Sequence, residues 1–200
     1  MPNWCNNTLE LHHEDPAMIE RAKKAFAEGQ LLNEFCPVPE SLHIVAGRVG
    51  DPDEQKKLEE AEKINFAQHG YKNWYDWCVN EWGTKWDVGG DDGMLTEESP
   101  NKIIVSFDSA WAPPCNAYEK MLDLGFSIRA MYYEGGMCFA GIWEDGDDDF
   151  YDLSGYNSEQ AKEDLPEALD EMFCISESMA DYEEENQEID LDGGLSATNE

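Results

Sequence analysis

Acidic residues become much more frequent in the sequence after Trp143, and this change in composition limits where a folded core can lie. Residues 144–200 hold 21 acidic residues and one basic residue, Lys162, which gives this stretch a net charge of −20. The whole chain carries −32, so residues 1–143 account for −12. A segment so rich in like charges repels itself. We therefore expect a compact domain in residues 1–145 and an acidic, partly helical extension in residues 146–200.

Periodicity within residues 1–145 indicates both strands and helices. Ile103, Val105 and Phe107 alternate with polar residues, which is typical of a half-buried strand. Strands are expected at residues 4–13, 84–88, 102–109, 127–133 and 137–143. Helices are expected at residues 16–28, 51–69, 71–82 and 115–124, because apolar residues recur there at helical spacing and a glycine follows each stretch.

The order of these elements predicts the fold class. Strand, helix, short strand, strand, helix and strand follow one another, with one additional hairpin strand. This order is that of an α+β, ferredoxin-like split βαβ sandwich. A helical region at about residues 40–82 is inserted into it.

Composition excludes several classes of function. A pI of about 4.1 implies a field that repels phosphates and anionic lipid, so we expect neither direct nucleic-acid binding nor membrane association. The N-terminus carries no export signal, so we expect a cytoplasmic protein with reduced thiols. The six cysteines are widely spaced without a CxxC pair, and no catalytic or cofactor motif occurs, so we expect no metal, no cofactor and no enzyme.

Four motifs in residues 1–145 resemble a known family. They are Pro2-Asn3-Trp4-Cys5-Asn6-Asn7; Asn73-Trp74-Tyr75-x-Trp77 with Trp82-Gly83-Thr84-Lys85-Trp86-Asp87; Ser109-Ala110-Trp111-Ala112-Pro113-Pro114; and Tyr132-Tyr133-Glu134 with Gly136 and Phe139-Ala140-Gly141. Together they resemble the YubB-type ferredoxin-like domain family of bacteriophages and conjugative plasmids. The resemblance implies a ferredoxin-like fold and a mobile-element setting, with the host cytoplasm as its location if the gene is carried by a phage. It implies no activity and no catalytic residues.

The acidic extension also carries apolar residues at helical spacing, among them Ala161, Leu165, Leu169, Met172 and Phe173. A purely solvating tail needs no such stripe. We therefore expect the extension to dock on the domain and to hold its carboxylates in place for a basic, nucleic-acid-binding partner, as a DNA mimic does. The residues expected to form this face are Asp145, Asp147, Asp148, Asp149, Glu163, Glu167, Asp170, Glu171, Glu177 and Asp181.

A rival interpretation places function in an aromatic pocket. In it, the chain is a nucleotide-binding or small-ligand-binding protein, or an enzyme, and its acidity serves only solubility. The residues expected to line the pocket are Asn3, Trp4, Asn6, Trp82, Lys85, Trp86, Trp111 and Glu134. Aromatic residues at helical spacing more often form a core than a stacking platform for a base, so the interaction protein is the preferred reading.

Overall fold

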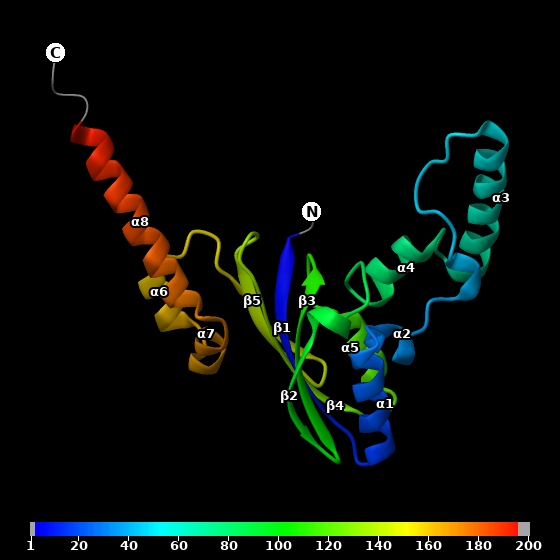
Figure 1. The fold of residues 1–200 in the computed structure, drawn as a ribbon, viewed down its shortest axis with the longest axis horizontal. Coiled ribbons are helices and arrows are strands. Elements are labelled where there is room, and N and C mark those ends of the chain that lie inside the picture. Colours follow the sequence, from blue (N-terminus) through cyan, green and yellow to red (C-terminus); the bar gives the residue numbers. More distant parts are fainter. Residues whose placement is uncertain (1–2, 196–200) are drawn as a thin grey trace.

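The computed structural model describes residues 3–195, with side chains described as far as Asn186, and is built around one six-stranded sheet (Figure 1). The strands are β1 (Trp4–His12), β2 (Met94–Ser99), β3 (Lys102–Ala110), β4 (Ser127–Glu134), β5 (Phe139–Glu144) and β6 (Asp147–Asp152). Their order across the sheet is β2-β3-β1-β4-β5-β6, and all neighbouring pairs are antiparallel. The α+β class expected from the sequence is confirmed.

Several helices within the described residues begin at a side-chain cap, and the helix expected at residues 71–82 begins three residues later, at Trp74. They are α1 (Pro16–Ala27), α2 (Leu31–Phe35), α3 (Pro52–His69), α4 (Trp74–Glu81), α5 (Cys115–Leu122), α6 (Ser158–Asp164), α7 (Glu167–Phe173) and α8 (Ile175–Leu195), with 3₁₀ turns η1 (Glu40–Leu42) and η2 (Gly90–Asp92). Asp15, Asp51 and Asn73 cap α1, α3 and α4 by accepting free backbone N–H groups. The helical region expected at residues 40–82 is confirmed by η1, α3 and α4.

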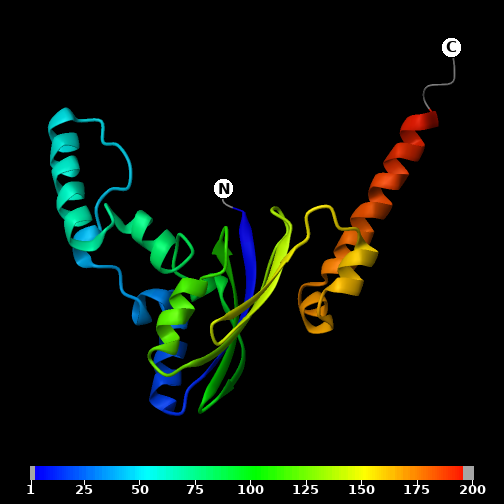
Figure 2. The ribbon, with the colours of Figure 1, turned by 180° about the vertical axis from the view of Figure 1, so that it is seen from behind.

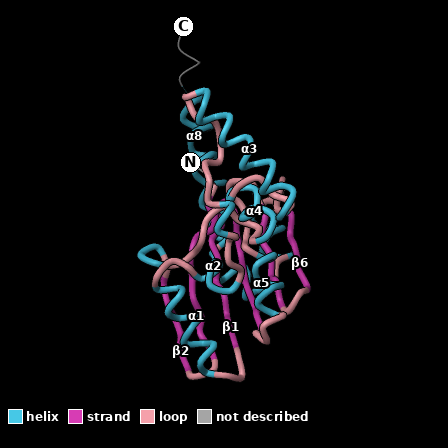
Figure 3. Tube along the Cα trace, turned by 90° about the vertical axis from the view of Figure 1, so that its right-hand side faces the viewer, coloured by secondary structure: helices cyan, strands magenta, loops and turns pink. Residues whose placement is uncertain are grey.

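The main core lies between one face of the sheet and helices α1, α2 and α5. Figure 3 looks onto this face and shows the helices lying over the strands. Leu9 and Leu11 of β1 are fully buried there, together with Val105 of β3, Phe26 of α1 and Met121 of α5. Burial of these side chains supplies the main stabilisation of the fold.

A second, smaller core covers the opposite face of the sheet, and it is formed by the acidic C-terminal segment. Helices α6, α7 and α8 lie on that face, away from α1 and α5 (Figures 1 and 2). Leu165, Leu169 and Ile175 are buried here against Met131 of β4 and Ala140 of β5. The chain therefore forms three layers, with the sheet between two groups of helices.

Strand β4 is buried on both faces because it lies under both groups of helices. Ile128 and Tyr132 face the main core, whereas Met131 faces the second core. The apolar periodicity of the sequence also predicts nine core residues, of which seven are buried and two, Leu122 and Ile142, are half-buried. The nine are Leu9, Leu11, Phe26, Leu122, Val105, Phe107, Ile128, Met131 and Ile142.

The strand expected at residues 84–88 is wrong. This stretch is a loop that forms side-chain hydrogen bonds instead of a strand ladder. Thr84 Oγ1 donates to the carbonyl of Ala110 at the end of β3, and the Asp87 carboxylate accepts the N–H groups of Leu32 and Asn33 at the start of α2. The strand that pairs with β3 on the side away from β1 is β2, whose residues are exposed throughout. An exposed edge strand needs no apolar alternation, so the periodicity gave no signal for it.

The C-terminal segment begins with a strand. β6 pairs with β5 over its whole length, so the last strand of the sheet lies beyond the boundary drawn at residue 145. The apolar residues at helical spacing are shared between two helices, with Ala161 in α6 and Leu169 in α7. Pro166 has no backbone N–H donor and disfavours a helical conformation in the residue before it. Leu165 is therefore extended, and α7 begins after Pro166.

Candidate functional site

Local hydrogen bonds fold the acidic segment into a defined unit. Asn157 and Gln160 form a reciprocal capping box at the start of α6. The Glu183 carboxylate of α8 accepts the backbone N–H and the hydroxyl of Ser158, and this contact ties the two helices together. At the junction of α7 and α8, Asp170 accepts the N–H of Ser176 at 2.7 Å and its hydroxyl at 2.6 Å.

Apolar contacts attach this unit to the sheet. Of the expected stripe, Ala161, Leu165 and Leu169 are buried in the second core, Phe173 is half-buried against it and Met172 is 46% exposed. The stripe therefore marks an attachment face, as its spacing indicated. The helical backbone that carries the carboxylates of α6, α7 and the first part of α8 is consequently anchored to the sheet.

The structure places four of the ten expected acidic residues together. Glu167, Asp170, Glu171 and Glu177 line one shallow groove of about 850 Å³ between α6, α7 and α8. Glu159 lines it too and was missed, although it is as acidic and as close to the apolar stripe as the others. Glu163 and Asp181 are exposed but do not line this groove.

The other four expected acidic residues lie at the edge of the sheet. Asp145 stands in the turn before β6 and accepts hydrogen bonds from Ser127 Oγ and from the N–H of Ile128. Asp147 and Asp149 are exposed on β6, on the face that carries the second core. Asp148 points to the opposite face, where it accepts the Tyr132 hydroxyl at 2.7 Å. Burial and this carboxylate raise the pKa of Tyr132 far above its usual value.

The acidic segment has little internal neutralisation. Within residues 3–186, the ion pairs use carboxylates from Glu10 to Glu144, and none involves a later acidic residue. Lys162 lines the groove as the single basic residue of the segment. Carboxylates that are fixed in place but unpaired produce a strong negative potential above α6, α7 and α8.

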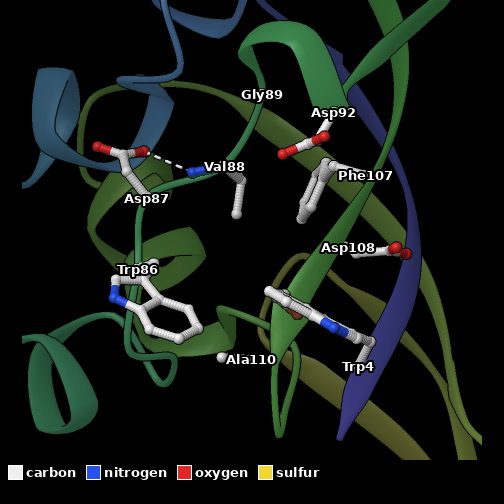
Figure 4. A pocket seen from close by; sticks show the side chains of 10 residues that line it. Trp4, Trp86, Asp87, Val88, Gly89, Asp92, Phe107, Asp108 and Ala110 are labelled. Atoms are coloured by element: carbon white, nitrogen blue, oxygen red, sulfur yellow. Dashed lines mark hydrogen bonds between the residues drawn. The ribbon is translucent and has the colours of Figure 1, made fainter. Parts of the chain in front are cut away.

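The second candidate site is a cavity of about 530 Å³ beside the start of β1 and the end of β3 (Figure 4). Its indole walls are Trp4 and Trp86, with ring centroids 5.9 Å apart and planes inclined by 34°. Trp4 is 47% exposed and Trp86 is 40% exposed, so both rings face solvent as well as the cavity. Phe107 and Val88 form the apolar interior.

Three aspartates, none of them expected from the sequence, also line this cavity: Asp87, Asp92 and Asp108. Asp87 points away from the interior and accepts three backbone N–H groups (Figure 4). Burial raises its pKa, and these hydrogen bonds oppose the rise. Asp108 accepts the Asn6 amide at 2.7 Å. The loop over residues 84–93 brings Asp92 to β3, and no local pattern reveals such a contact.

The other expected pocket residues separate into neighbours of the cavity and structural residues. The Lys85 ammonium lies 4.3 Å from the ring centroid of Trp86 and 5.6 Å from that of Trp111. Trp82 is buried in the main core, where its indole N–H donates to the carbonyl of Cys36. Glu134 is buried and accepts the N–H groups of Gly136 and Met137 in the turn after β4. The carbonyl of Asn3 accepts the N–H of Trp111.

No helix within the described residues is both long enough and apolar enough to cross a membrane. No family model and no curated protein sequence matches this chain. A crystal structure of the protein api92 from Yersinia pseudotuberculosis, described with the family model DUF1281, is similar to it. The match has 14% sequence identity and a TM-score of 0.43, and it covers 76% of this chain and 98% of the other.

Proposed function

We propose that this chain is a non-enzymatic interaction protein that binds a basic protein through the carboxylates of α6, α7 and the first part of α8. The observation that carries the proposal is the combination of burial and charge in this segment. Apolar side chains fix the helices on the sheet, while their carboxylates form no ion pairs within residues 3–186. A fixed array of like charges costs little ordering entropy when a partner of opposite charge binds.

The preferred partner has a groove that ordinarily holds nucleic acid. Glu167, Asp170, Glu171 and Glu177 line one surface, so a lysine- or arginine-rich groove can contact several carboxylates at once. The same groove on the partner would hold the phosphates of a DNA duplex. We infer that the chain imitates DNA and displaces it from a host or rival protein.

The proposal extends to fold family and setting. Strands β2, β3, β1 and β4 lie in that order, with α1 following β1 and α5 following β3 in the chain. This arrangement supports a ferredoxin-like split βαβ unit to which β5, β6 and the C-terminal helices are added. Together with the motif resemblance to the YubB-type family, it supports a mobile-element accessory protein that acts in the host cytoplasm, in counter-defence or host takeover.

The test is capture of a partner from host lysate, followed by binding measurements with the captured protein. A triple variant, Glu167→Gln, Glu171→Gln and Glu177→Gln, removes three exposed carboxylates for which no side-chain hydrogen bond or ion pair is observed. The matched control, Glu14→Gln, Glu54→Gln and Glu60→Gln, removes the same charge from exposed positions outside the segment. Association with the captured protein should slow strongly for the first variant and little for the control.

Two further measurements, the dependence of affinity on ionic strength and competition by duplex DNA, complete the test. Affinity should fall steeply as ionic strength rises, because counterions screen the charges, and duplex DNA should compete for the same partner. Equal binding by the two triple variants would refute the proposed surface. Simultaneous binding of DNA and this chain to the partner would refute the mimicry.

A further inference from the structure

We propose that the cavity lined by Trp4, Trp86 and Asp92 binds an organic cation, namely an ammonium or guanidinium group with apolar substituents. This site is separate from the acidic surface of α6, α7 and α8, because it lies beside the start of β1 and the end of β3. The inference does not depend on the proposed function. Four observations carry it: the aromatic walls, the charge of the lining, a cation already held by the same cluster, and the size of the cavity.

The walls suit a cation with apolar substituents. Two partly exposed indoles lie 5.9 Å apart at the cavity, and Phe107 and Val88 close its interior (Figure 4). The face of an indole is the most favourable aromatic surface for a cation, and several rings around one site form the aromatic cages that hold quaternary ammonium groups. Exposure of apolar tryptophan rings to water at a concave site is unfavourable, and a ligand that covers the rings removes this cost.

The charge of the lining selects the sign of the ligand. Three aspartates and no lysine or arginine among the described residues line the cavity. Asp87 points away from the interior (Figure 4), and Asp108 accepts the Asn6 amide. Asp92 therefore supplies the charge for a ligand. The Asp92 carboxylate stands opposite the two indoles in Figure 4, so a bound cation would lie between a carboxylate and aromatic faces. Carboxylates at this position repel phosphate, and the nucleotide considered from the sequence is therefore the less suitable ligand.

The chain itself provides a cation held by the same aromatic cluster. Lys85 does not line the cavity, yet its ammonium lies 4.3 Å from the ring centroid of Trp86 and within 6 Å of the rings of Tyr75 and Trp111. These distances are typical of cation–π interactions. This contact shows that the Trp86 ring can hold a cation, although the Lys85 ammonium itself repels a second positive charge nearby.

The cavity volume, about 530 Å³, lies in the range of small-molecule sites. It accommodates a small free cation or the end of a methylated lysine or arginine side chain. Both kinds of ligand carry a positively charged group with apolar substituents. Free choline and a peptide with one trimethyllysine therefore serve as two arms of the test, and they distinguish a small-molecule source from a protein source.

The experiment follows the indole N–H signals of the seven tryptophans by NMR while choline is added to the full chain at constant ionic strength. Shift changes should be largest at Trp4 and Trp86 and should saturate. The neutral isostere 3,3-dimethylbutan-1-ol should bind at least about tenfold more weakly, because it lacks the charge that the rings and Asp92 recognise. The trimethyllysine peptide should shift the same two signals if the cation is carried by a protein.

Two neighbouring aspartates give a matched control. Asp92→Asn should weaken choline binding, whereas Asp91→Asn removes the same charge from the same turn without touching the cavity and should not. Trp86→Ala should weaken binding about tenfold or more, and Phe66→Ala, an exposed aromatic on α3, should leave it unchanged. Equal effects of the two aspartate variants, equal binding of the neutral isostere, or tighter binding of adenosine monophosphate than of choline would overturn the proposal.

Discussion

The Tyr132 hydroxyl reaches across β5 and donates a 2.7 Å hydrogen bond to Asp148 of β6. Tyr132 and Gly141 are partners in the ladder between β4 and β5, and Gly141 is in turn the partner of Phe150. A Cβ atom at Gly141 would lie 2.2 Å from the hydroxyl oxygen of Tyr132. The Tyr132 side chain can therefore cross β5 and reach the edge strand β6 only because residue 141 has no side chain.

Gly141→Ala should destabilise the protein by about 1–3 kcal/mol, because the methyl group forces the Tyr132 ring out of its position. The free energy of unfolding, measured by urea denaturation, checks this. The double variant with Tyr132→Phe should recover little of the loss, since the ring carbon Cζ would still lie 2.3 Å from the added Cβ atom. Equal stability of the wild type and the alanine variant would contradict the packing described here.

Leu169→Ala should be strongly destabilising, whereas Met172→Ala on the same helix should be nearly neutral. Leu169 is fully buried in the second core and Met172 is 46% exposed. Truncating a buried leucine typically costs about 2–5 kcal/mol. Hydrogen exchange of α6 and α7 should rise in the leucine variant, because its attachment to the sheet is weakened. Similar losses in the two variants would argue against the second core.

The thiols should divide into reactive and unreactive groups. Burial raises the pKa of Cys5 and Cys78 to about 12, so both are almost entirely protonated at pH 8. Cys138 and Cys174 are exposed. Ellman's reagent should therefore modify two thiols rapidly in the native protein and the others only on unfolding. Replacing Cys138 and Cys174 by serine should remove the rapid phase, and its persistence would contradict this assignment.

The stability difference between the wild type and Asp87→Asn should depend on pH. Burial raises the pKa of Asp87 in the folded state, so folding favours its protonated form. The stabilisation that this group contributes is therefore fully present below its unfolded pKa and is lost as pH rises through the raised value. Relative to the variant, the wild type should gain stability as pH falls from 7 toward 4. A constant difference in unfolding free energy over this range would contradict the shift.

The sequence alone determined the elements whose signals are local. Ile103, Val105 and Phe107 predicted β3 by alternation, and apolar residues at helical spacing predicted helices at residues 16–28, 51–69 and 115–124 that the structure confirms as α1, α3 and α5. Composition determined the concentration of negative charge after Trp143. These features depend on residues that are close together in the sequence, so they can be predicted without knowledge of the fold.

Only the tertiary structure decided which strands lie at the edges and which residues meet in a cavity. β2 and β6 are exposed edge strands without apolar alternation, and their pairing depends on β3 and β5 rather than on their own composition. Asp92 and Trp4 are far apart in the chain and line one cavity because the loop over residues 84–93 folds back on the start of β1. Contacts of this kind depend on packing between residues that are far apart in the sequence, so local periodicity does not predict them.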